Sequence, residues 1–283
     1  MLVVVLLDSS ASMGDPIIQF ENGEDPISKF DVASEMLNDF FYNAVEKCAA
    51  EDKFKEYLDF AILAYNDNVF SPIKGVSLSE YPISVNELGN EKTYHKVIDI
   101  EDPSYDGTSS PIKWISDDKV YGTTSMWEAF RKAKEIISNW VEYHPDSHPP
   151  ILINISDGII GYISTNNDTD DEIFDYDDVI ETCEEIKKLG TNDGNTLIAN
   201  AHISDSEINE IKYPSSVEVI ENLRDGFAPT LFSMSSKIPP AWVGSGEKYG
   251  ISDLTNESRL YVYNADMSTL VKFFKFGTDP TNA

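Results

Sequence analysis

The chain has 283 residues, with 50 acidic against 21 basic side chains and a net charge of −29. This length favours one domain with insertions, and 41% hydrophobic residues are enough for a sizeable core, which argues against wholesale disorder. The acidic field argues against nucleic acid and anionic membrane surfaces as partners, and it favours cations and basic protein surfaces.

Cysteine content and apolar runs indicate the compartment. Only Cys48 and Cys183 occur, each in a segment with helical spacing, and so few cysteines favour a reducing compartment. The apolar run at residues 2–7 lacks a basic segment before it and is too short to cross a membrane. We therefore expect a cytoplasmic protein.

Strand and helix patterns alternate along the first part of the chain. Residues 2–7 are continuously apolar, which is typical of a strand covered on both faces. A capping-box pattern at Ser28 and Asp31 predicts the start of a helix, and apolar residues follow at helical spacing up to residue 48. Residues 59–65 predict a second buried strand, followed by a turn and a short third strand.

Residues 71–121 interrupt this alternation and contain several prolines. We interpret them as an elaboration, partly strand and partly loop, of a kind that is usually functional or mobile in a compact domain.

Beyond residue 121 the alternation of strands and helices resumes. The next helix begins at a capping-box pattern of Ser125 and Glu128, and a later one is expected to end at Gly190. In chain order we expect a helix from 125, a strand at 151–155, a helix at 179–189, a strand at 196–203, a C-terminal extension from about 225, a strand at 259–264 and a helix at 270–276. The whole pattern predicts a doubly wound α/β fold, with a mainly parallel sheet flanked by helices on both faces, as a single domain over residues 1–283.

Three loops at one edge of the predicted sheet carry oxygen-bearing side chains, where ligands bind in such folds. Asp8, Ser10 and Ser12 follow the first strand, Thr124 opens a helix, and Asp157 follows the strand at 151–155. An all-oxygen set suits a hard cation, and we expect Mg²⁺, or else Mn²⁺ or Ca²⁺. In this hypothesis the three hydroxyls contact the ion, while the two carboxylates bind its waters and balance its charge. We expect an Asp8→Ala variant to fold, because Asp8 stands at a strand end and not in the core.

These motifs resemble the von Willebrand factor A family and its metal-ion-dependent adhesion site. The family's DxSxS motif, distant Thr and distant Asp match Asp8, Ser10, Ser12, Thr124 and Asp157. The resemblance covers residues 1–70 and 120–204 and implies the family's Rossmann-like fold. It also implies a metal ion whose open position accepts an Asp or Glu of a partner protein. One departure is a threonine at 123, where the family usually has glycine.

The C-terminal part of the chain is similar to a narrower group within that family. Residues 231–239 and 263–266 resemble cytoplasmic bacterial members encoded beside tellurite-resistance and phosphatase or kinase genes. That resemblance implies a role in a bacterial stress or defence system. It also implies a kinase, phosphatase or ATPase encoded nearby as a partner.

Two other function classes are weighed against a binding module. A metal-dependent hydrolase of the haloacid-dehalogenase type needs a second aspartate at position 10, where this chain has Ser10, and the three loops lack His and Cys. We therefore expect no catalytic residues and no enzyme. An extracellular adhesin is disfavoured because the chain lacks a signal segment and a disulfide framework. The acidic loop at 168–178 is interpreted as a solvated rim beside the site, and His202 has no evident partner.

Overall fold

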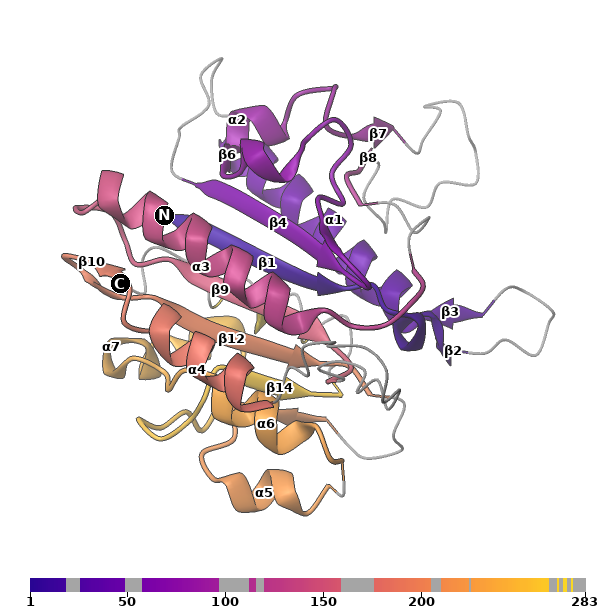
Figure 1. Ribbon diagram of the computed structural model, residues 1–283. Coiled ribbons are helices and arrows are strands. Elements are labelled where there is room, and N and C mark those ends of the chain that lie inside the picture. The colour runs from indigo at the N-terminus through magenta and orange to yellow at the C-terminus, as the bar shows by residue number, and fades with distance from the viewer. Residues whose placement is uncertain are drawn as a thin grey trace, which may run out of the picture.

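The continuous apolar runs of the sequence form the centre of one mainly parallel sheet (Figure 1). The computed structural model describes residues 1–18, 26–48, 58–96, 112–115, 120–158, 176–204, 210–223 and 225–264, together with residues 269, 272, 273 and 276. Within these ranges the main sheet has eight strands. Five of them run parallel to one another, and these are β1 (Leu2–Asp8), β4 (Asp59–Tyr65), β9 (Ile151–Ser156), β12 (Leu197–His202) and β14 (Tyr261–Tyr263). The doubly wound α/β fold predicted from the sequence is thus confirmed.

Short antiparallel strands complete the edges of this sheet. Its spatial order is β13-β14-β12-β9-β1-β4-β5, and β6 also pairs with β4. The three antiparallel strands are β5 (Val69–Phe70), β6 (Ile83–Ser84) and β13 (Ile211–Lys212). β1 is buried at every residue because both of its neighbours and the helices on both faces cover it, which explains its unbroken apolar sequence.

Helices cover both faces of the sheet. The longest are α1 (Lys29–Cys48), α3 (Met126–Tyr143) and α4 (Tyr176–Ile186). In Figure 1, α3 and α4 cross in front of the sheet and α1 lies behind it. The shorter helices are α2 (Val85–Leu88), α5 (Val217–Glu221), α6 (Ala228–Met234), α7 (Pro240–Val243) and the 3₁₀ turns Ala11–Gly14, Leu78–Glu80 and Gly246–Tyr249. Because each long helix buries its apolar side, one hydrophobic core includes residues from β1 through to Phe276.

The elaboration at 71–121 contains more helix than the sequence indicated. Its described part includes α2, whose start is a true capping box formed by Ser84 and Glu87. Ribbons outside the main sheet are β2 (Pro16–Ile18) with β3 (Ile27–Ser28), β7 (His95–Lys96) with β8 (Ile112–Lys113), and β10 (Gly190–Thr191) with β11 (Gly194–Asn195). Residues 97–111 and 116–119 of the elaboration, and 168–175 of the predicted acidic loop, lie outside the described residues.

Two predicted helix ends differ from the structure. α4 ends at Ile186, not at residue 189, because Gly190 begins the β10–β11 hairpin. A side chain at Gly190 would meet the Gly194 carbonyl oxygen at 2.5 Å, so glycine serves the close approach of these two strands. Ser125 does stand before α3, but its side chain makes no capping bond. Its backbone N–H donates to the Asn66 carbonyl, and Glu128 pairs with Arg131.

The order of the strands places a topological switch point at the centre of the sheet. After β1 the chain builds β4 and β5 on one side, and it then crosses to build β9, β12 and β14 on the other. The winding direction therefore reverses between β1 and β9. In open α/β sheets, ligands bind at such a switch point, beyond the carboxyl ends of the strands. Asp8 ends β1 and Asp157 follows β9, so the two predicted metal carboxylates flank this point.

Candidate metal centre

Asp8 is a fully buried carboxylate at the end of β1. Its Oδ1 accepts a hydrogen bond from the Ser10 backbone N–H at 2.9 Å, and its Oδ2 accepts one from the Ser156 hydroxyl at 2.7 Å. Burial, and then the neighbouring charge of Asp157, raise the pKa of Asp8 to about 7. The expectation that Asp8 lies outside the core is therefore wrong, because the strand carries it below the surface. A divalent ion beside it would favour its ionised form.

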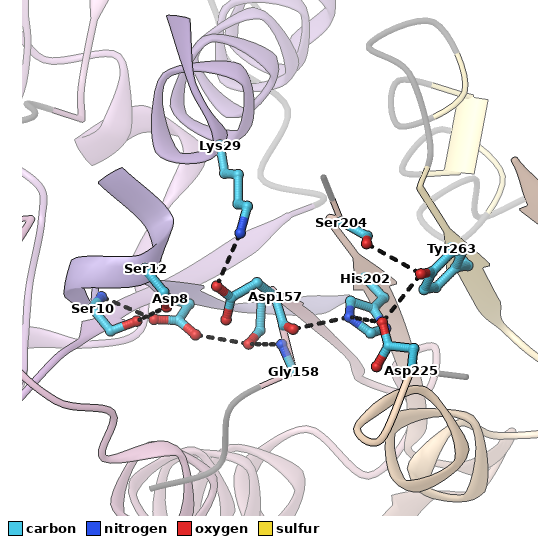
Figure 2. Close-up of polar contacts among 11 residues, drawn as sticks. Asp8, Ser10, Ser12, Lys29, Asp157, Gly158, His202, Ser204, Asp225 and Tyr263 are labelled. Carbon is cyan, nitrogen blue, oxygen red and sulfur yellow. Dashed lines mark hydrogen bonds and ion pairs between the residues drawn. The ribbon is translucent and has the colours of Figure 1, made fainter. Parts of the chain in front are cut away.

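Asp157 directly follows β9 and is also buried. Its Oδ2 lies 3.4 Å from the ammonium nitrogen of Lys29, which is the first residue of α1 (Figure 2). Its Oδ1 is buried and has no hydrogen-bond partner in the part of the chain that the structure describes. Such an oxygen is costly to bury unless a cation or donor completes it.

The loop after β1 brings the two serines of the motif together. The hydroxyl oxygens of Ser10 and Ser12 lie 3.2 Å apart, and both residues stand beside the buried Asp8 (Figure 2). Ser10 is buried and Ser12 is half-buried. The 3₁₀ turn that begins at Ala11 forms this geometry, since it bends the chain directly beyond the strand.

Thr124 is buried in a neighbouring loop that backbone hydrogen bonds tie to the first one. The Ala11 N–H donates to the Gly122 carbonyl at 3.1 Å, and the Tyr121 N–H donates to the Ser9 carbonyl at 3.1 Å. These bonds place the loop of Thr124 against the loop of Ser10 and Ser12. The Thr124 hydroxyl makes no hydrogen bond to the side chains of the other four predicted ligands.

Thr123, the departure from the family pattern, has a structural role. Its backbone N–H and hydroxyl donate to Asp67 Oδ1 at 2.6 and 2.7 Å. These two bonds lower the pKa of Asp67. Gly122 adopts a φ of +76°, and a side chain there would collide with the Asp67 carboxylate at 2.4 Å. Thr123 thus links this loop to the turn after β4 by two hydrogen bonds, and a glycine at this position would lack the hydroxyl bond to Asp67.

His202 is a buried residue that the sequence analysis missed. Its Nε2 donates to the Asp157 carbonyl at 2.9 Å, and its Nδ1 accepts from the Tyr261 hydroxyl at 3.0 Å. Burial is the main cause that lowers the pKa of His202, so the neutral ring is favoured. The signal was its place at the end of β12, in register with Ser156, because that position puts it at the same sheet edge.

Asp225 connects His202 to the C-terminal part of the chain (Figure 2). Its Oδ2 lies 3.5 Å from His202 Nε2 and accepts from the Tyr263 hydroxyl at 3.1 Å. Its Oδ1 accepts from the backbone N–H groups of Phe227 and Ala228, at the start of α6. The segment after residue 225 therefore supports the backbone of Asp157 through His202.

The structure thus brings four of the five predicted ligands into one group and sets Thr124 in the adjoining loop. Lys29 was missed in the sequence, although a lysine on the first turn of an otherwise amphipathic helix was the available signal. Among the described residues there is no group of three or more His, Cys, Asp or Glu side chains placed to hold a metal. The candidate centre differs from such groups because hydroxyls supply most of its oxygens.

Comparisons with known proteins leave the family of this chain open. No protein-family model and no curated protein matches it. Among solved structures, the pilus adhesin RrgA from Streptococcus pneumoniae is similar, with a TM-score of 0.27 and 16% sequence identity. The match covers 94% of this chain and 34% of the adhesin chain, and a likeness this weak carries no argument. In the described part of the chain, no helix has the length and apolar character needed to cross a membrane.

Proposed function

We propose that this chain is a binding module of the von Willebrand factor A type, which holds one divalent ion and uses it to bind a partner protein. The ligands would be Asp8, Ser10, Ser12, Thr124 and Asp157, and the ion would be Mg²⁺, Mn²⁺ or Ca²⁺. When bound, the ion would supply a Lewis-acidic position that accepts one carboxylate oxygen from the partner.

The observation that carries the proposal is that the buried Oδ1 of Asp157 has no hydrogen-bond partner among the described residues. A buried carboxylate oxygen without a donor is rare in a folded protein. Here the charge of Asp157 acts on the buried Asp8 carboxylate, which stands beside the Ser10 and Ser12 hydroxyls. Lys29 is the only described side chain that forms an ion pair with either carboxylate, and it pairs with Asp157 alone, so Asp8 has no cationic partner among the described residues. A hard divalent cation fits both the charge and the oxygen donors of this set.

The approach of a partner is limited to one side of the group. Asp8, Ser10, Thr124 and Asp157 are all buried, while Ser12 is half-buried. A partner carboxylate would therefore arrive beside Ser12, beyond the carboxyl edge of the sheet. Because the chain carries a net charge of −29, we infer a partner that surrounds its Asp or Glu with Lys and Arg.

Partner capture should depend on the ion. Immobilised protein incubated with a lysate of its source organism in Mg²⁺ is expected to retain a protein that EDTA releases. The Thr124→Ala variant should lose that protein, because it lacks one oxygen ligand, and Thr124→Ser should retain it as the matched control. A specific partner that stays bound in EDTA and to Thr124→Ala would show that the ion plays no part in recognition.

We propose further that the site is not catalytic. Both ring nitrogens of His202 are engaged within the protein, and both oxygens of Asp8 accept hydrogen bonds, so neither is free as a base or nucleophile. The wild-type protein is therefore expected to show no turnover of phosphate or nucleotide esters in Mg²⁺ or Mn²⁺. Turnover that disappears in Asp157→Ala would favour the hydrolase alternative instead.

A further inference from the structure

Lys29 is the charged group at the candidate centre that the proposed function does not use. Its ammonium nitrogen lies 3.4 Å from Asp157 Oδ2, and the two side chains are only 7% and 5% exposed. At this depth an ion pair is weakly screened by salt and solvent. The pair is therefore part of the site's electrostatics and differs in kind from the exposed Lys–Glu pairs within α3 and between α3 and α4.

Two features of its local environment disfavour a lysine at position 29. It is the first residue of a 20-residue helix, where the positive end of the helix dipole repels a cation. It is also buried, and a lysine is almost never fully buried without a partner. Its backbone N–H donates to the Asp15 carbonyl at 3.1 Å, which fixes the start of the helix near the site. Since both features oppose a cation here, its attraction to Asp157 is the compensating interaction.

The position of this ammonium conflicts with a second cation on the same carboxylate. A divalent ion held by Asp157 would lie within a few ångströms of the Lys29 nitrogen, in a region of low dielectric where like charges repel strongly. The lysine stem is long and flexible, so the ammonium can leave the carboxylate without a change in the α1 backbone. No group in the described ranges donates to Asp157 Oδ1, so this oxygen can bind an ion while Oδ2 faces Lys29.

We propose that Lys29 is an internal counter-ion of the site, which neutralises Asp157 in the metal-free protein and competes with the divalent ion for that carboxylate. The competition rests on the proposed metal-binding function, while the counter-ion role in the metal-free protein does not. The lysine lowers the affinity of the site for the ion and stabilises the fold when the ion is absent. A partner that supplies a carboxylate to the ion, and so adds negative charge, would offset the repulsion.

The test uses a variant that removes the charge of Lys29 and keeps a side chain of similar volume. Lys29→Met is expected to bind Mg²⁺ and Mn²⁺ about tenfold more tightly by calorimetry, because the repulsion is removed. In EDTA its Tm should fall by about 5 °C or more, since Asp157 is left buried without a partner, and saturating Mg²⁺ should reverse the loss. Lys134→Met is the matched control, because Lys134 pairs with Glu185 on the exposed surface, and both readouts should stay unchanged.

A double variant separates the two parts of the proposal. In EDTA, Lys29→Met with Asp157→Asn should regain most of the Tm that Lys29→Met loses, because no buried charge remains unpaired. If neither the wild type nor Lys29→Met binds Mg²⁺ or Mn²⁺ but this recovery occurs, the proposed metal function fails and the counter-ion role stands. Equal ion affinity in the wild type and Lys29→Met overturns the competition. An unchanged Tm in Lys29→Met overturns the counter-ion role.

Discussion

Replacing Asp8 with asparagine is expected to weaken Mg²⁺ and Mn²⁺ binding by about 100-fold while the protein stays folded. The substitution removes one of two carboxylates that would balance the ion. The amide retains the hydrogen bonds at this position, because its oxygen can accept from the Ser10 N–H and its NH₂ can donate to the Ser156 oxygen. Calorimetric titration with either ion measures the affinity, and far-UV circular dichroism with a melting curve checks the fold.

Asparagine is preferable to alanine here because Asp8 is fully buried. An alanine would leave the Ser10 N–H and the Ser156 hydroxyl without their acceptor, and lost affinity would then be hard to separate from lost structure. Asp193→Asn is a suitable control, since Asp193 is exposed in the turn of the β10–β11 hairpin. This hairpin precedes β12, so it lies at the amino ends of the strands, while the candidate metal centre lies at their carboxyl ends. Equal affinity in wild type and Asp8→Asn would contradict the assignment of the metal centre.

Replacing Gly158 with alanine is expected to destabilise the protein by about 3 kcal/mol and to impair metal binding at the same time. Gly158 has a φ of +94°, which disfavours any side chain. An added Cβ would also lie 2.6 Å from the Cβ of Phe227 and 3.1 Å from Nε2 of His202. The backbone must shift to relieve these contacts, and Asp157 is the adjacent residue. Denaturant unfolding measures the first effect and calorimetry measures the second.

Gly226→Ala is the matched control for this variant. Gly226 precedes Phe227, the residue that a side chain at Gly158 would meet. A Cβ added at Gly226 itself would meet nothing within 4 Å. Its free energy of unfolding should differ from that of the wild type by only about 0.5 kcal/mol. If Gly158→Ala unfolds at the same denaturant concentration as Gly226→Ala, the packing of Phe227 and His202 against Gly158 does not constrain the loop after β9.

The periodicity of the sequence was sufficient to predict the architecture. Unbroken apolar runs of six residues, as in β1 and β4, are typical of strands that are covered on both faces, and amphipathic stretches between them predict crossover helices. The predicted helix ends were wrong where one local sequence pattern is compatible with two sets of side-chain contacts. Ser125 and Glu128 match the capping-box pattern. In the structure Glu128 instead forms an ion pair with Arg131, three residues further along the same helix.

The candidate ligands follow from the sequence because each stands at the end of an apolar run, and parallel strands bring these ends to one edge. Asp8, Ser10, Ser12 and Asp157 needed no knowledge of packing beyond that rule. Their depth did not follow, since burial depends on the loops and helices that close over the edge. Asp8 was expected outside the core for this reason and is fully buried.

The amino-acid sequence by itself determined the alternation of strands and helices, the strongly acidic charge and the set of oxygen-bearing side chains at one sheet edge. Only the tertiary structure decided that Lys29 faces Asp157 across 128 positions and that His202 supports the Asp157 backbone from another strand. Periodicity is a local property that reports which face of an element is buried. Pairings between distant residues depend on how loops and helix ends pack, and no local pattern encodes that packing.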